Sequence, residues 1–275
     1  MVTKVLRRSE DVIDRVVVLE QFLAAMCCFS RPVSDVSNTR IFARLVPEGR
    51  QSLVYSMNVG APEDLAMILP IPVAASTPED GVQFINLEEY PQFFADLDRA
   101  FVSRKSDSFG RAAVAGAAKS LLKVEEVGSF VASFVPSEHD FERLDPRFRL
   151  PNGVWKKLGQ YAAFGFAVFQ LKKGNHRIHP MAFSFPTAHP DSLFFPTVHI
   201  HDGEVHPHAE FDHALFAQTA AEGLRSVLAW EESADLAAKT VDVKKSRGLV
   251  TADRHLLRRT LHGELKNEDT WLRVA

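Results

Sequence analysis

Three short apolar stretches bounded by turn-forming residues constrain this fold more than any other feature of the sequence. They span residues 39–45, 51–58 and 65–71, and each favours a β-strand. Pro47-Glu48-Gly49 and Gly60-Ala61-Pro62 lie between them, and proline and glycine are the strongest local signals for turns. The sequence therefore predicts an antiparallel meander over this part of the chain.

The rest of the chain mixes apolar runs typical of strands with apolar residues at helical spacing. Strands are expected at residues 124–135, 161–171, 178–185 and 193–201, and the end of the chain, 255–272, favours a strand. Helices are expected at residues 9–26, 87–101, 137–144, 151–158, 211–229 and 233–244. Together these elements predict an α+β fold with largely antiparallel sheet and flanking helices, in one compact unit or two closely packed lobes.

A change in composition divides the chain into two halves. Residues 103–123 are mostly Ser, Gly and Ala with scattered Arg and Lys, which is typical of a linker or a long excursion. We therefore expect four segments: an N-terminal amphipathic helix at 1–26, a β-rich half at 27–102, the linker at 103–123, and a C-terminal α+β half at 124–275.

Charge and hydropathy limit the partners and the compartment that we expect. The net charge of -3 and the sequence pI of about 6.4 give no electrostatic reason to expect nucleic acid. The longest apolar run, 161–171, is shorter than the roughly 20 residues of a membrane-spanning helix. Charged residues such as Asp14 and Glu20 interrupt the apolar stretch near the N-terminus, which argues against a signal peptide. The sequence thus predicts a soluble, cytoplasmic protein with no nucleic-acid or membrane partner.

The most informative chemistry lies in the histidine-rich segment 199–208. Asp202-Gly203 has the composition of a two-residue hairpin turn, which requires positive φ at both central residues. In such a hairpin His199 would lie opposite His206, and alternate side chains would point to the same face. Five residues would then share one polar face: His199, His201, Glu204, His206 and His208.

This polar face predicts a site for a divalent transition metal. Directly opposed Cβ atoms lie about 4.5–5.5 Å apart, which lets two imidazoles share one ion. Neutral imidazole suits zinc, copper, iron or nickel, and a carboxylate can complete the ligand set. Zinc or another divalent transition metal is therefore the expected cofactor, and a metal-bound water would support hydrolysis.

Two other interpretations of the same face stay open at this stage. A half-buried antiparallel hairpin has one polar face in any case, so the histidines could be solvated and bind nothing. A specific metal site would draw a further ligand from elsewhere in the chain, such as His179, His189, Asp212 or His213. Clustered histidines could also sense pH, because the pKa of an unperturbed imidazole is about 6.5.

The adjacent cysteines Cys27 and Cys28 allow a different function. If translation began at Met26, removal of that residue would make Cys27 an N-terminal nucleophile with its own α-amino group as the base, as in the amidohydrolases of that class. Cysteine is also common in protein cores as a small apolar residue. Neighbouring cysteines rarely bond to each other, so no structural disulfide is expected.

A non-enzymatic binding or interaction protein, whose partner stays unknown, is the remaining alternative. The chain holds 21 Phe, and either a Phe-rich surface or the helix at 9–26 could contact a partner. Lys244, Lys245 and Arg247 form a small basic cluster, of the kind found more often on a solvated surface than at a phosphate. The sequence contains no dinucleotide-binding, P-loop or nucleophile-elbow motif.

Several blocks of sequence resemble an uncharacterised family of bacterial proteins of unknown function. The blocks are residues 26–30 (MCCFS), 53–57, 66–73 (AMILPIPV), 132–136, 164–169 (FGFAVF), 179–183 and 199–205 (HIHDGEV). The resemblance covers most of the chain from Met26 onwards, and the middle blocks also resemble a second, exported family of unknown function. It implies a bacterial protein and supplies no activity, cofactor or catalytic residue.

Overall fold

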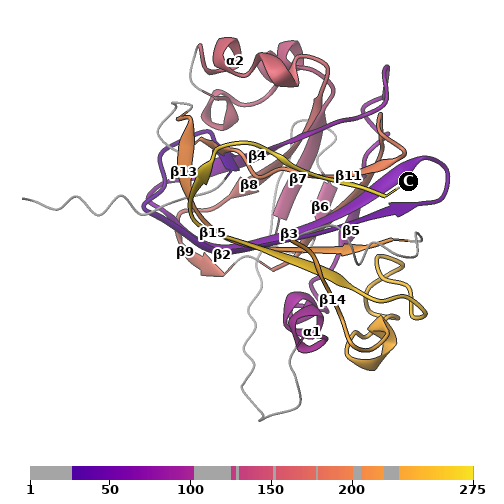
Figure 1. The fold of residues 1–275 in the computed structure, drawn as a ribbon. Coiled ribbons are helices and arrows are strands. Elements are labelled where there is room, and N and C mark those ends of the chain that lie inside the picture. The colour runs from indigo at the N-terminus through magenta and orange to yellow at the C-terminus, as the bar shows by residue number, and fades with distance from the viewer. Residues whose placement is uncertain are drawn as a thin grey trace, which may run out of the picture.

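The computed structural model describes residues 27–101, 125–127, 130–150, 153–177, 179–200, 206–219 and 229–274 (Figure 1). In this part of the chain, strands form two large sheets and one small sheet. The first large sheet has six strands in the spatial order β12 (His199–Ile200), β1 (Cys27–Phe29), β4 (Leu65–Ile71), β8 (Gly165–Leu171), β7 (Phe130–Val135) and β6 (Glu125–Val127).

The second large sheet has eight strands and contains the longest ones. Seven of them follow the order β14 (Glu231–Glu232), β15 (Leu257–Lys266), β13 (His208–Gln218), β2 (Asp35–Val46), β3 (Arg50–Ala61), β10 (Met181–Pro186) and β5 (Gln83–Asn86), and the eighth, β9 (Gly174–Arg177), also pairs with β3. The small sheet pairs β11 (Ser192–Phe195) with β16 (Thr270–Arg273).

Both large sheets contain strands from before and from after segment 103–123. In the first sheet β4 pairs with β8, and in the second β13 pairs with β2 and β10 pairs with β3. The two halves predicted from composition therefore share both sheets. Segment 103–123 and the predicted helix at 9–26 lie outside the described residues.

Helices are few and short among the described residues. The α-helices are α1 (Phe93–Arg99) and α2 (Val154–Lys157), and the 3-10 helices are Glu138–Arg143, Pro146–Phe148, Gly159–Tyr161 and Ala237–Lys239. No helix of the described part has the length and hydropathy needed to cross a membrane. Strands make up 46% of this structure and helices 12%. The predicted α+β fold with flanking helices is therefore wrong, and the fold is mostly β.

The predicted helix at 211–229 is wrong over its first part, which belongs to β13. Phe211 and Leu215 are four residues apart, a spacing that fits one face of a helix and one face of a strand equally well. The burial of His213 and Ala217 distinguishes the two, because it completes an inward face with the strand period of two. β13 pairs with β2 on one side and with β15 on the other, which satisfies its backbone hydrogen bonds.

Most of the predicted strands are confirmed, with one change of partner. β2 and β3 form the first predicted hairpin, and φ is positive at both Glu48 (67°) and Gly49 (66°) in its turn. β4, which was predicted as the third strand of the meander, belongs instead to the first sheet, where it pairs with β1 and β8. The strand favoured at 255–272 is confirmed as β15 and β16.

Apolar side chains fill three layers, one between the large sheets and one on the outer face of each. In the central layer Phe169 of β8 and Phe183 of β10 join the two sheets, with ring centroids 5.8 Å apart. Segment 141–161, which includes α2, covers the outer face of the first sheet, and α1 with segment 237–256 covers that of the second. Figure 1 shows α1 and α2 on opposite sides of the sheets. Every residue of β4 is therefore buried, which explains its uninterrupted apolar sequence.

Candidate functional site

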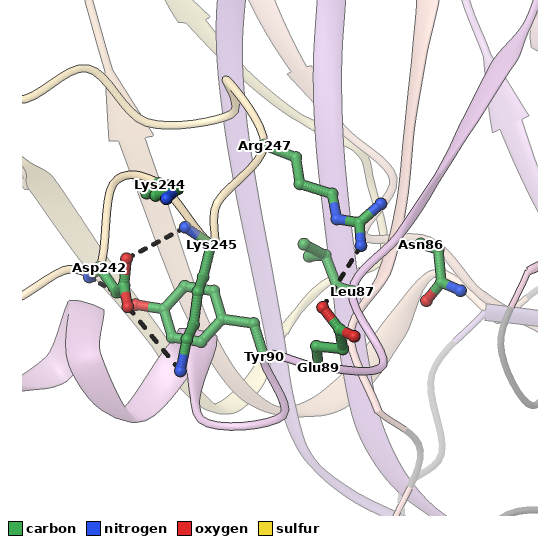
Figure 2. A pocket seen from close by; sticks show the side chains of 8 residues that line it. All are labelled: Asn86, Leu87, Glu89, Tyr90, Asp242, Lys244, Lys245 and Arg247. Carbon is green, nitrogen blue, oxygen red and sulfur yellow. Dashed lines mark hydrogen bonds and ion pairs between the residues drawn. The ribbon is translucent and has the colours of Figure 1, made fainter.

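A pocket of about 340 Å³ opens beside α1, on the outer side of the second sheet. Two segments line it, the connection from β5 to α1 and the turn at residues 242–247 (Figure 2). The lining residues are Asn86, Leu87, Glu89, Tyr90, Asp242, Lys244, Lys245 and Arg247. Segments about 150 residues apart in sequence thus form one concave surface.

Tyr90 fixes the two walls of this pocket to each other. Its hydroxyl donates a hydrogen bond to Asp96 Oδ2 (2.7 Å) and accepts one from the backbone N–H of Asp242 (2.9 Å). Burial and the bond to Asp96 raise the pKa of Tyr90, so the hydroxyl stays protonated at neutral pH. Asp96 in turn forms an ion pair with Arg99 (2.8 Å), and Arg99 donates to the carbonyl of Thr240 (3.0 Å). The turn at 242–247 is therefore anchored to α1.

The turn itself is tight and places its basic side chains around the pocket. Asp242 Oδ1 accepts a hydrogen bond from the backbone N–H of Lys245 (3.0 Å), and the Asp242 carbonyl accepts one from Ser246 (3.0 Å). The chain then reverses through positive φ at Arg247 (50°) and Gly248 (84°). Glycine adopts this conformation at no steric cost, which suits it to the second position.

Three cations and two carboxylates surround the pocket, and their mutual contacts are long. Arg247 Nη2 lies 3.6 Å from Glu89 Oε2, and Lys245 Nζ lies 3.8 Å from Asp242 Oδ2. Figure 2 shows the first pair on one side of the pocket and the second on the other side, next to the Tyr90 ring. Exposed ion pairs of this kind contribute about 0–1 kcal/mol, so a ligand can replace them at little cost.

The sequence prediction for this basic cluster was a solvated surface. The structure agrees that Lys244, Lys245 and Arg247 are exposed. The sequence did not indicate that they face Tyr90 and Glu89 across a pocket, because no local pattern relates the two segments. The hydrogen bond between the Asp242 N–H and the Tyr90 hydroxyl holds the two segments together.

Three of the five predicted metal ligands lie within the described residues, and they differ in burial. His199 is buried in β12, whereas His206 and His208 are exposed, the latter at the start of β13. His201 and Glu204 lie outside the described residues. Within the described residues no group of three or more His, Cys, Asp or Glu side chains is arranged to hold a metal ion. The five-residue metal site therefore stays a prediction.

The Asp202-Gly203 turn lies within residues 201–205, outside the described residues, so the hairpin stays a prediction, and the strands on either side of it each pair with another strand. His199 is the register partner of Cys27 in β1, and His208 is the partner of Lys266 in β15. The Asn267 side chain nevertheless holds the two ends together: its amide nitrogen donates to the carbonyls of His199 (3.0 Å) and His206 (2.9 Å).

His199 instead meets His213, one of the further ligands considered from the sequence. Each residue is 2% exposed, the ring centroids are 5.2 Å apart and the ring planes are inclined by 28°. Phe211 packs against both rings, with centroid distances of 4.2 Å to His199 and 4.8 Å to His213. Two imidazoles from different sheets thus share a nearly water-free space.

This burial predicts a specific dependence of stability on pH. Desolvation, with the neighbouring His199, holds the pKa of His213 well below 6.5. Below pH 6.5 His213 therefore binds a proton in the unfolded chain but not in the folded protein. Its contribution to the free energy of unfolding is complete above pH 6.5 and is lost as the pH falls.

We expect the difference in unfolding free energy between the wild type and His213→Phe to fall by about 1.4 kcal/mol per pH unit below pH 6.5. Urea unfolding of both proteins between pH 5 and pH 8 measures this difference, in steps of about half a pH unit. A difference that stays constant over this range would show that His213 titrates normally.

The two cysteines lie in β1, beside His199. Cys28 is buried in the apolar layer on the outer face of the first sheet and forms no disulfide bond with a described residue. The backbone of Cys27 pairs with β12 through His199. Residues 1–26 lie outside the description, so the N-terminal-nucleophile alternative stays a prediction.

Solved structures with a similar chain path include those of baculovirus P35. One crystal structure of P35 is 13% identical with a TM-score of 0.47, and the match covers 88% of this chain and 97% of that chain. A mutated P35 after caspase cleavage gives 13% and 0.48, covering 87% and 100%, and the caspase-8/P35 complex gives 12% and 0.42, covering 86% and 96%. At these values the likeness assigns no activity, partner or binding residue to this chain.

Comparison of the sequence with protein families and with curated proteins finds no relative. No protein-family model matches the chain, and no curated protein matches it. The predicted membership of an uncharacterised bacterial family therefore stays a prediction.

Proposed function

We propose that the protein is a binding protein whose ligand presents a phosphate or carboxylate group to the pocket between residues 86–90 and 242–247. The observation that carries this proposal is the arrangement of Lys244, Lys245 and Arg247 around a pocket of about 340 Å³. Pockets for small molecules typically measure about 300–1,000 Å³. The proposal sharpens the non-enzymatic alternative drawn from the sequence and keeps the cytoplasm as the expected compartment.

An oxyanion would interact more strongly with these cations than the carboxylates of Glu89 and Asp242 do. The two ion pairs across the pocket are 3.6 and 3.8 Å long, beyond the range of a charge-assisted hydrogen bond. The guanidinium of Arg247 can bind two oxygens of one phosphate or carboxylate at once, and each lysine can add a contact. Binding would thus replace two loose contacts by shorter and better aligned ones.

The pocket is also preorganised, which reduces the entropy that binding removes. Tyr90 ties the 242–247 turn to α1, and Asp242 and Ser246 close the turn through hydrogen bonds. A turn held in this way does not have to be ordered by the ligand. Leu87 and Tyr90 line the pocket but are each only 1% exposed, so a ligand would contact mainly the charged side chains around them.

Neutralising the three cations is expected to weaken the binding of pyrophosphate, used as the probe, by tenfold or more. The variant is Lys244→Ala, Lys245→Ala, Arg247→Ala, and hydrogen bonds to charged groups contribute about 1.5–3 kcal/mol each before solvent screening is considered. Isothermal titration calorimetry at low and at physiological salt measures the effect. Wild-type affinity should fall as salt screens the pocket.

The matched control is Lys172→Ala, Lys173→Ala, which removes two exposed, adjacent lysines away from the pocket. This control should bind pyrophosphate as the wild type does. Equal loss of binding in both variants would show that pyrophosphate binds to surface charge in general and not to this pocket, and would overturn the proposal. An unchanged affinity in the triple variant would do the same.

A further inference from the structure

Two buried polar side chains, one in the histidine pair and one next to it in the sheet, lack a hydrogen-bond partner in the described structure. They are His213, whose two ring nitrogens are both unbonded, and Thr39, through its hydroxyl. Thr39 of β2 and His213 of β13 are register partners, so their side chains leave the sheet on the same face. Buried polar groups nearly always bond to protein, water or an ion. His213 and Thr39 therefore point to something bound between them.

We infer that His199 and His213 bind one divalent transition-metal ion, with the Thr39 hydroxyl beside it. The two nitrogens on a tetrahedral zinc ion, each about 2.0–2.1 Å from the metal, lie about 3.3 Å apart. Ring centroids 5.2 Å apart allow facing nitrogens to reach that separation. The planes are inclined by 28°, so one ring has to rotate about its Cβ–Cγ bond, a torsion with a broad energy minimum.

The surroundings of the pair suit a metal ion better than a proton. The register neighbours of His213 are Thr39 and Leu261, and Phe211 packs against both rings, so no carboxylate among these residues would stabilise an imidazolium. Neutral imidazole is the form that zinc, copper and nickel bind. Burial lowers the pKa of His213, which keeps that ring neutral at pH 7.

Access and coordination number follow from the position of the pair. β12 is the outermost strand of the first sheet, and the Asn267 side chain covers its edge by accepting from the His199 N–H (2.7 Å) and donating to the His199 carbonyl (3.0 Å), so an ion would enter beside Asn267. Two protein nitrogens leave positions for water, and the Thr39 hydroxyl is placed to hydrogen-bond to such a water. This site shares only His199 with the five metal ligands predicted from the sequence. It does not involve the proposed anion-binding pocket between residues 86–90 and 242–247 (the anion pocket).

Zinc titration of the full chain, purified without a histidine tag and dialysed against a chelator, tests this inference. We expect calorimetry and elemental analysis to give one equivalent of Zn²⁺ per chain, and Zn²⁺ to raise the unfolding temperature because it binds only the folded protein. His213→Phe keeps an aromatic ring beside Phe211 and His199 and removes both ring nitrogens. It should weaken Zn²⁺ binding by more than about 100-fold, since loss of an outer partner alone costs 10–100-fold.

The matched control is His206→Gln, His208→Gln, which removes the two exposed histidines and leaves the buried pair. This control should bind Zn²⁺ as the wild type does, and Thr39→Val should bind it about tenfold more weakly. Thr39→Val preserves side-chain shape and reports on the site even where His213→Phe folds poorly. Zinc binding that is lost in the control and kept in His213→Phe overturns the inference, as does less than about a tenth of an equivalent in the wild type.

Discussion

Replacing Phe183 by alanine is expected to lower the free energy of unfolding by about 3–5 kcal/mol. Phe183 is fully buried in β10 and packs against Phe84, Phe169 and Phe185, with centroid distances of 5.8–6.1 Å. Phe169 belongs to the other large sheet, so truncation removes contacts between the sheets as well as within one. The cavity left in such a layer closes only partly, which adds to the lost transfer free energy.

Chemical denaturation with urea measures this loss, and His262→Ala is the matched control in the same sheet. His262 is an exposed residue of β15, and substitutions at exposed strand positions usually change stability by less than about 0.5 kcal/mol. A loss below about 1 kcal/mol for Phe183→Ala would contradict the packing of the two sheets described here.

The second large effect is expected at Asp269, where alanine should cost about 2–4 kcal/mol. Asp269 Oδ1 accepts hydrogen bonds from the backbone N–H groups of Thr197 (2.9 Å) and Val198 (3.2 Å), and Oδ2 accepts one from the Tyr161 hydroxyl (2.6 Å). Alanine leaves all three donors without this acceptor. Glu268→Ala is the control, because its side chain is exposed and forms an ion pair with the exposed Lys266.

Asp269 also gives a pH dependence with the opposite sign to that of His213. Burial raises its pKa to about 6, against 3.8 in the unfolded chain, and the hydrogen bonds from Tyr161, Thr197 and Val198 oppose this shift only in part. The folded protein therefore holds more protons between these values, and its stability falls as the pH rises from about 4 to 6.

Asp269→Asn removes this titration and keeps one acceptor oxygen for the backbone donors. The stability of the wild type relative to this variant should fall by about 2–3 kcal/mol between pH 4 and pH 6. Thermal or urea unfolding at fixed ionic strength measures the difference. A relative stability that rises over the same interval would mean that the pKa of Asp269 is lowered by its hydrogen bonds.

Local patterns in the sequence predicted where most strands lie but not which strands are neighbours. The turn at Pro47-Glu48-Gly49 and the apolar runs of β3, β4 and β8 carry short-range signals, and these strands form where expected. Their order in the sheets depends on contacts between distant segments, which no local pattern contains. The helix predicted at 211–229 is wrong over residues 211–218, because Phe211 and Leu215 fit both a helical and a strand period.

The candidate site shows the same limit. The Asp202-Gly203 signal led to the prediction of a hairpin whose turn lies outside the described residues, and no local signal indicated that β12 pairs with β1 or that β13 pairs with β15 and β2. His213 was considered only as one of several outside ligands, since its contact with His199 arises where the two sheets meet. The anion pocket needed Tyr90 to connect segments about 150 residues apart, and sequence spacing gave no sign of it.

A crystal structure of the protein soaked with tungstate, a tetrahedral oxyanion with a strong anomalous signal, tests the proposed pocket most directly. We predict an anomalous peak between the 86–90 segment and the 242–247 turn, with oxygens about 2.7–3.2 Å from the side-chain nitrogens of Lys244, Lys245 or Arg247. Peaks at other surface lysines with none in this pocket would contradict the account.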